Sequence, residues 1–155
     1  MGGRRAVARA TMRFAAMALA LLTCVEARAE DDYPNITGVW VGEYAVAFPD
    51  GHPVFRGESR TSETELRITK QKGNLFWVQK RWRPVGVEDW TVESATGTFY
   101  PFDPERISIA ELGPAPEDAN TGFMEGVLRE GKIHLVYRGI GPAGGISFAV
   151  TLTKR

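Results

Sequence analysis

From residue 38 onward, hydrophobic and polar positions alternate in short runs, and no stretch keeps a helical period over three turns. Turn-forming residues separate these runs at the regular spacing typical of a β-sandwich or β-barrel. The pattern predicts eight strands. They are expected at Gly38–Phe48, Thr64–Gln71, Leu75–Trp82, Asp89–Tyr100, Arg106–Leu112, Thr121–Arg129, Ile133–Arg138 and Ile146–Lys154.

The connections between these strands are mostly short. Glu130-Gly131 has the form of a two-residue hairpin turn, and Gly113–Asn120 is the clearest loop in the chain. Gly97 interrupts a strand and predicts a bend or a bulge there. The sequence therefore predicts an all-β fold, an eight-stranded antiparallel up-and-down barrel of calycin-like type. Eight strands close with room for side chains or one small ligand. A β-sandwich is the alternative.

The first 29 residues have a different pattern. Four arginines precede the apolar run Phe14–Val25, which ends at the small-x-small site Ala27-Arg28-Ala29. The run is shorter than the roughly 20 apolar residues of a membrane-spanning helix. We predict a cleavable export signal over 1–29, a single β-barrel domain over 30–155, and a periplasmic or extracellular location in a bacterium, by the general secretory or the twin-arginine route. Lipidation at Cys24 is an alternative, although Thr23 departs from the usual lipobox.

Removing this signal changes the charge and the chemistry of the chain. The full sequence has 19 basic and 19 acidic residues, but five arginines and one glutamate lie in 1–29. The remaining 126 residues have 14 basic and 18 acidic side chains, a net charge of −4. This excess of acid argues against a nucleic-acid partner and against binding or stable insertion at an anionic membrane. The single cysteine, Cys24, lies in the segment expected to be cleaved, and the sequence has only two histidines. We therefore expect no cofactor and no metal site.

The segment Ile36-Thr37-Gly38-Val39-Trp40 opens the first strand with Gly-x-Trp. It is similar to the start of lipocalins, and the whole run is similar to the start of avidin-type barrels. The resemblance implies a calycin-like meander barrel in which Trp40 packs in the barrel base against Lys154 or Arg155. A cation over an aromatic face contributes about 0.5–2 kcal/mol. The chain lacks the disulfides and the late helix usual in lipocalins, and the polar residues with which avidins hold biotin do not follow Trp40. The resemblance thus implies a fold and no particular ligand.

Glu111 is the strongest candidate for site chemistry. It shares a strand face with Ile107 and Ile109, and the alternation of a later strand places Tyr137 on an apolar face in the same way. If these faces line the barrel interior, burial would raise the pKa of the Glu111 carboxyl and suit it to ligand contact or acid–base chemistry. The alternative is that Glu111 lies at the mouth of the strand and is solvated, because unpaired glutamates are rarely buried.

Aromatic and basic residues supply further candidates. Trp40 and Trp82 are predicted to contact a ligand together with Glu111 and Tyr137, although core packing also explains the tryptophans. Lys80-Arg81-Trp82-Arg83 could form an anion or carbohydrate platform, or could be a strand end with side chains that reach solvent. The alternation leaves the direction of Glu125 undecided, points His134 to the surface, and places His52 in a turn.

No Ser-His-Asp order, phosphate-binding glycine loop or dense metal-ligand cluster occurs in the sequence. The leading hypothesis is an exported binding protein for a small apolar or amphipathic ligand held in its barrel. One alternative is an envelope protein-interaction module that uses the Gly113–Asn120 loop. Another is a barrel enzyme in which Glu111 and Tyr137 transfer protons to a bound substrate.

Overall fold

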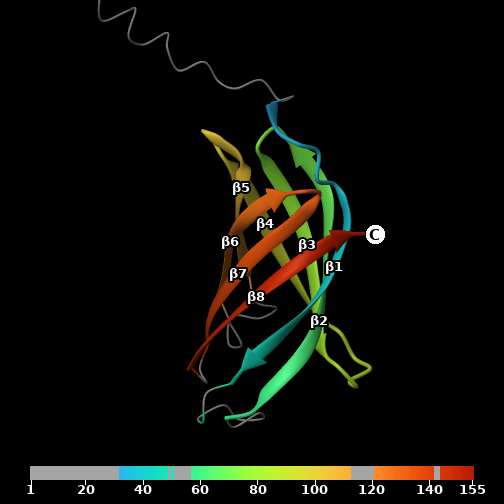
Figure 1. Ribbon diagram of the computed structural model, residues 1–155, viewed down its shortest axis with the longest axis vertical. Coiled ribbons are helices and arrows are strands. Elements are labelled where there is room, and N and C mark those ends of the chain that lie inside the picture. The colour runs from blue at the N-terminus through green and yellow to red at the C-terminus, as the bar shows by residue number, and fades with distance from the viewer. Residues whose placement is uncertain (1–31, 49, 51–56, 113–120, 142–143) are drawn as a thin grey trace, which may run out of the picture.

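Eight antiparallel strands form a closed barrel in which each strand pairs with its neighbours in sequence and β8 pairs with β1 (Figure 1). The computed structural model describes residues 32–48, 50, 57–112, 121–141 and 144–155. The strands are β1 Gly38–Ala47, β2 Ser59–Lys72, β3 Leu75–Pro84, β4 Thr91–Tyr100, β5 Asp103–Leu112, β6 Thr121–Arg129, β7 Lys132–Gly141 and β8 Gly144–Lys154. The up-and-down barrel prediction is confirmed, and the β-sandwich alternative is wrong.

The largest boundary difference is at the start of β2. This strand begins at Ser59 rather than Thr64, because its first residues pair with the second half of β1, for example Ser62 with Tyr44. Its inward positions there are Ser62 and Thr64, both buried and polar, so the hydrophobic alternation that marks a strand is missing from the sequence.

The expected bend or bulge at Gly97 is absent. The ladders on both sides run through this residue, which pairs with Phe76 on β3 and with Ile109 on β5. The register shift of β4 lies between Phe99 and Tyr100 instead. A Cβ at position 97 would collide with the ring of Phe76, so the glycine is required by the packing of that ring inside the barrel.

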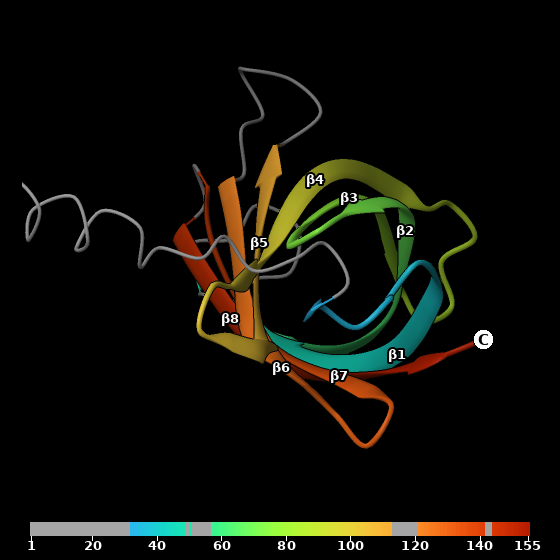
Figure 2. The ribbon, with the colours of Figure 1, turned by 90° about the horizontal axis from the view of Figure 1, so that it is seen from above.

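The two ends of the barrel differ in their connections. One end, here called the turn end, has the tight turns after β2, β4 and β6; the other, the loop end, has the connections after β1, β3, β5 and β7. Figure 2 shows the strands curling around the interior. Apolar side chains fill the turn-end half, and most are no more than 3 % exposed. They include Trp40, Leu66, Ile68, Phe76, Phe99, Ile107, Ile109, Ile133, Leu135 and Leu152.

Trp40 lies in this turn-end core, as the resemblance implied. Its indole Nε1 donates a hydrogen bond of 2.8 Å to the carbonyl of Ile36. Lys154 pairs with Trp40 across the β1–β8 ladder, and its Nζ lies 5.7 Å from the centre of the indole ring. Lys154 is therefore the basic partner of Trp40, whereas the guanidinium of Arg155 lies 3.4 Å from Glu65.

The seam between β1 and β8 has a short ladder of only two residue pairs among the described residues, Trp40 with Lys154 and Val41 with Thr153. Nearer the loop end, stacked aromatic rings join the two strands. The ring of Tyr44 stacks on Phe148 with centroids 3.7 Å apart, and Phe148 stacks on Tyr137 at 4.7 Å. The seam thus depends on side-chain packing as well as on backbone hydrogen bonds.

The hairpin turn predicted at Glu130-Gly131 joins β6 to β7. Both residues have positive φ, 52° at Glu130 and 71° at Gly131, which matches a type I′ turn. Because Glu disfavours this conformation and Asn tolerates it, we expect Glu130→Asn to stabilise the protein by about 0.5–1 kcal/mol. Urea denaturation would measure the change. Gly131→Ala should instead lower the free energy of unfolding. A destabilising effect of Glu130→Asn would contradict the assignment of backbone strain to Glu130.

Candidate functional site

A layer of polar side chains crosses the interior of the barrel in its loop-end half. Six of the eight strands contribute one side chain each, and all these side chains are buried. This polar layer consists of Tyr44 on β1, Ser62 on β2, Lys80 on β3, Glu93 on β4, Glu111 on β5 and Tyr137 on β7. Such a concentration of buried ionisable groups is uncommon in a small domain, since each charge must be taken out of water.

Lys80 is the central cation of the polar layer. Its Nζ donates a hydrogen bond of 2.9 Å to Oε2 of Glu93 and lies 2.6 Å from Oε1 of Glu111. The same ammonium lies 4.7 Å from the centre of the Tyr137 ring. Two carboxylates therefore share one ammonium, and when all three groups are ionised the layer has a net charge of −1.

The Glu111 carboxyl is 2 % exposed, so the solvated alternative for this residue is wrong. Its remaining partner is the hydroxyl of Tyr137. Neither carboxylate oxygen has a well-directed hydrogen bond, despite the short approach of Lys80. Burial raises the pKa of Glu111, and the charge of Glu93 adds to the rise, while Lys80 opposes it. A glutamate with a raised pKa keeps its proton to a higher pH than an exposed glutamate does.

Two phenols complete the layer. Burial raises the pKa of Tyr44 and of Tyr137 well above the ordinary value, and the nearby carboxylates add to both shifts. These hydroxyls consequently stay protonated, and that of Tyr137 faces the Glu111 carboxyl as a donor. Tyr44 has the Ser62 hydroxyl as its partner, although the fully buried Ser62 Oγ has no hydrogen bond of good geometry.

Paired glycines on β6 and β7 hold Glu111 and Tyr137 together. Gly122 faces Gly139 across the ladder. A Cβ at Gly122 would collide with Oε2 of Glu111 and meet the Tyr137 ring, and a Cβ at Gly139 would lie 2.5 Å from the Tyr137 hydroxyl oxygen. The space that two side chains would occupy is thus taken by the carboxyl and the phenol.

The structure brings together two of the four predicted ligand-binding residues, Glu111 and Tyr137. Trp82 lies two residues beyond Lys80 on the same face of β3, toward the loop end, and is half-buried. Trp40 lies four residues before Tyr44 on β1, in the turn-end core, and is therefore separate from the polar layer.

Glu93 was not singled out from the sequence, and Lys80 was considered only as part of the Lys80-Arg81-Trp82-Arg83 platform. They pair directly across the β3–β4 ladder. One signal was present: Lys80 follows Phe76 and Val78 at a spacing of two, which places it on the apolar face of β3. The same alternation divides the expected basic and aromatic platform, because Lys80 and Trp82 point inward while Arg81 and Arg83 point outward.

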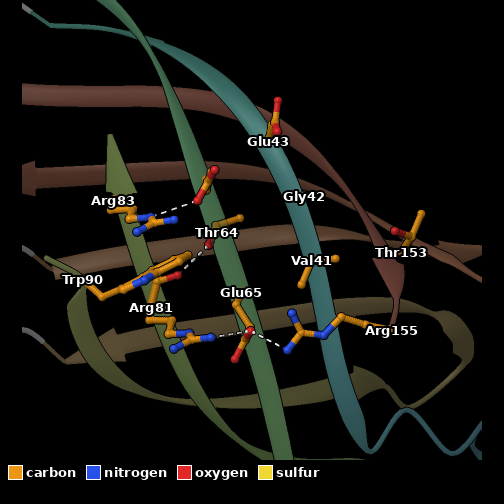
Figure 3. A pocket seen from close by; sticks show the side chains of 11 residues that line it. Val41, Gly42, Glu43, Thr64, Glu65, Arg81, Arg83, Trp90, Thr153 and Arg155 are labelled. Carbon is orange, nitrogen blue, oxygen red and sulfur yellow. Dashed lines mark hydrogen bonds and ion pairs between the residues drawn. The ribbon is translucent and has the colours of Figure 1, made fainter. Parts of the chain in front are cut away.

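A groove with a volume of about 450 Å³ lies on the outer wall, over β8, β1, β2 and β3 (Figure 3). Trp90 lies between Arg81 and Arg83, whose guanidinium carbons are each 4.5 Å from the centre of its ring. Arg83 also pairs with Glu63 at 2.9 Å. The outward half of the expected platform is therefore a network of internal contacts.

Glu65 forms part of the lining of this groove and is only 3 % exposed. Arg81, Arg155 and Arg67 approach its carboxylate at 2.8, 3.4 and 3.4 Å. Burial alone would raise the pKa of Glu65, but the hydrogen bond from Arg81 and the three positive charges outweigh burial and lower it. Glu65 is thus a fixed anion that links β2 to β3 and to the residue after β8.

The remaining candidates lie on the outer surface or outside the described residues. Glu125 points outward, accepts a hydrogen bond of 2.9 Å from Tyr100, and leaves Met124 in the core. His134 is exposed and contacts Thr151, as its alternation predicted. His52, the Gly113–Asn120 loop and the export signal with Cys24 lie outside the described residues. Within the described ranges, no group of three or more acidic, histidine or cysteine side chains could hold a metal ion.

No protein-family model matches this chain, and no curated protein matches it. Among the residues that the structure describes, no helix is long and apolar enough to cross a membrane. Of what the lipocalin and avidin resemblance implied, the structure therefore supports the eight-stranded antiparallel closed barrel, and no family match adds to this.

Proposed function

We propose that this protein is an exported binding protein that takes a small amphipathic molecule into the loop-end half of its barrel. The observation that carries the proposal is the polar layer, in which Glu111 and Ser62 have buried oxygen atoms without well-directed hydrogen bonds. Buried polar atoms in native proteins nearly always have well-directed hydrogen bonds, so buried oxygens that lack them, even with Lys80 and Tyr137 close to Glu111, favour this layer as the place where a polar ligand group would bind.

Exposure within the barrel supports the same location. At the turn end, Phe99 and Leu152 have no solvent exposure, whereas Phe48 and Phe148 toward the loop end each keep 8 %. Val46 and Phe48 are apolar and follow Tyr44 on the inward face of β1. A ligand entering from the loop end would therefore place its polar group at the polar layer and its apolar part against these side chains.

Filling the loop-end half of the interior should abolish binding. Val46→Trp adds bulk inside the barrel, and the matched control Ala47→Trp introduces the same side chain on the exposed outer side of the same strand. We expect the uncharged dye N-phenyl-1-naphthylamine to bind the purified protein, and to bind Val46→Trp at least about tenfold more weakly while Ala47→Trp is unchanged.

Native mass spectrometry of protein purified from an exporting host should in addition show a co-purified small molecule that Val46→Trp lacks. Far-UV circular dichroism would establish that both variants are folded. Dye affinity that is equal in Val46→Trp and Ala47→Trp, or no binding by the unmodified protein, would overturn the proposal.

A further inference from the structure

The donors and acceptors of the polar layer are unequal in number. Glu93 and Glu111 together offer four carboxylate oxygens, and within the described part of the chain the cation that pairs with them is Lys80. The three N–H groups of Lys80 face Glu93, Glu111 and the ring of Tyr137. All three N–H groups of Lys80 therefore have partners within the protein, whereas the Glu111 carboxylate oxygens can still accept hydrogen bonds.

The surroundings of this free capacity favour positive charge. Glu111 and Glu93 repel an anionic group, and the stack of Tyr44, Phe148 and Tyr137 rings, with Lys80 already over the Tyr137 ring, lies in the same half of the barrel. The Gly122 and Gly139 cradle holds the Glu111 carboxyl in place before any ligand arrives. A fixed, buried carboxylate beside aromatic rings is a common means of recognising an ammonium group.

We infer that the ligand of this barrel has a protonated amine, which the Glu111 carboxylate binds beside the Tyr44–Phe148–Tyr137 ring stack. This inference rests on the proposed function. A second positive charge would balance the second carboxylate, so the ammonium would bind to the ionised form of Glu111. The groups that face Glu111 are Lys80 from β3, Glu93 from β4 and Tyr137 from β7, with Tyr44 from β1 in the same layer.

Burial raises the pKa of Glu111, so at a pH where this carboxyl still holds its proton, binding an ammonium would release that proton. Affinity for an amine should therefore rise with pH until Glu111 is ionised in the free protein. Affinity for an uncharged molecule of the same shape should lack this dependence.

Nonylamine, nonanol and nonanoate share one tail and differ in the head group. We expect nonylamine to displace the bound N-phenyl-1-naphthylamine at a concentration about tenfold or more below that of the other two. Glu111→Gln should remove this preference, so that nonylamine displaces the dye no better than nonanol does. The control Glu43→Gln removes an exposed carboxylate from the outer side of β1. It should not change the concentration at which any of the three probes displaces the dye.

Calorimetry on the unmodified protein, in buffers of different ionisation enthalpy, gives a test that does not depend on a variant's folding. It should show proton release with nonylamine and none with nonanol. Equal binding of the three probes, or amine binding without proton release, would overturn the amine inference and leave the proposed function standing. If neither the dye nor any probe binds, both the amine inference and the proposed function are wrong.

Discussion

Replacing Lys80 with methionine is expected to lower the free energy of unfolding by about 3–5 kcal/mol at neutral pH, because it leaves two carboxylates in the barrel without their cation. Lys80 opposes the rise that burial causes in the pKa of Glu111, so without Lys80 this pKa would lie further above its unfolded value. Groups shifted in this direction favour folding below the unfolded pKa and lose that contribution as pH rises through the folded pKa. The defect of Lys80→Met should therefore shrink as the pH is lowered from about 8 to about 5.

Urea denaturation at several pH values would measure this effect. Lys72→Met is the matched control, since Lys72 is exposed at the end of β2, and we expect it to change stability by less than about 0.5 kcal/mol. Neutralising both carboxylates as well, in Lys80→Met with Glu93→Gln and Glu111→Gln, should recover much of the loss. A defect in Lys80→Met that does not depend on pH would contradict this account of the polar layer.

Gly97→Ala is expected to destabilise the protein by about 1–3 kcal/mol, although alanine normally suits a strand interior better than glycine. The added methyl group would overlap the ring of Phe76, which is 1 % exposed and cannot move to solvent. Thermal or urea denaturation would measure the change. Thr96→Ala, at the exposed neighbouring position, should have little effect.

The same explanation predicts a coupling between the two residues. Phe76→Leu removes part of the ring with which the new methyl group collides, so the double variant should be more stable than the sum of the single changes predicts. Strictly additive effects would show that Gly97 is required for another reason.

The sequence predicted the barrel because the strand pattern is local. Three of the last four strands, β5, β7 and β8, have inward apolar residues at a spacing of two, and the Glu130-Gly131 turn fixes the hairpin of β6 and β7. The start of β2 escaped prediction since its inward residues, Ser62 and Thr64, are polar. Their place inside the barrel is set by pairing with β1, which lies outside any local window of sequence.

The candidate site was predictable in part for a related reason. Glu111 and Tyr137 follow apolar residues on their strands, and this position marked them. Burial of the Glu111 carboxylate depends on a cation from β3, which is Lys80. Lys80 belongs to a run of basic residues whose pattern is also typical of a solvent-exposed strand end. A buried charge and its partner are brought together by tertiary structure, so the pattern of one strand cannot show the pair.

The seam between β1 and β8 bears on how the barrel assembles and on what happens when it opens. Its pair of Trp40 with Lys154 joins positions 114 apart in the chain, the contact with the highest cost in loop entropy, whereas every other strand pair is a hairpin between neighbours. The meander can therefore form before the ring closes. Until Tyr44 and Phe148 stack, β1 and β8 are two exposed sheet edges that can pair with another chain. Aromatic packing at the seam thus protects the protein from edge-to-edge aggregation.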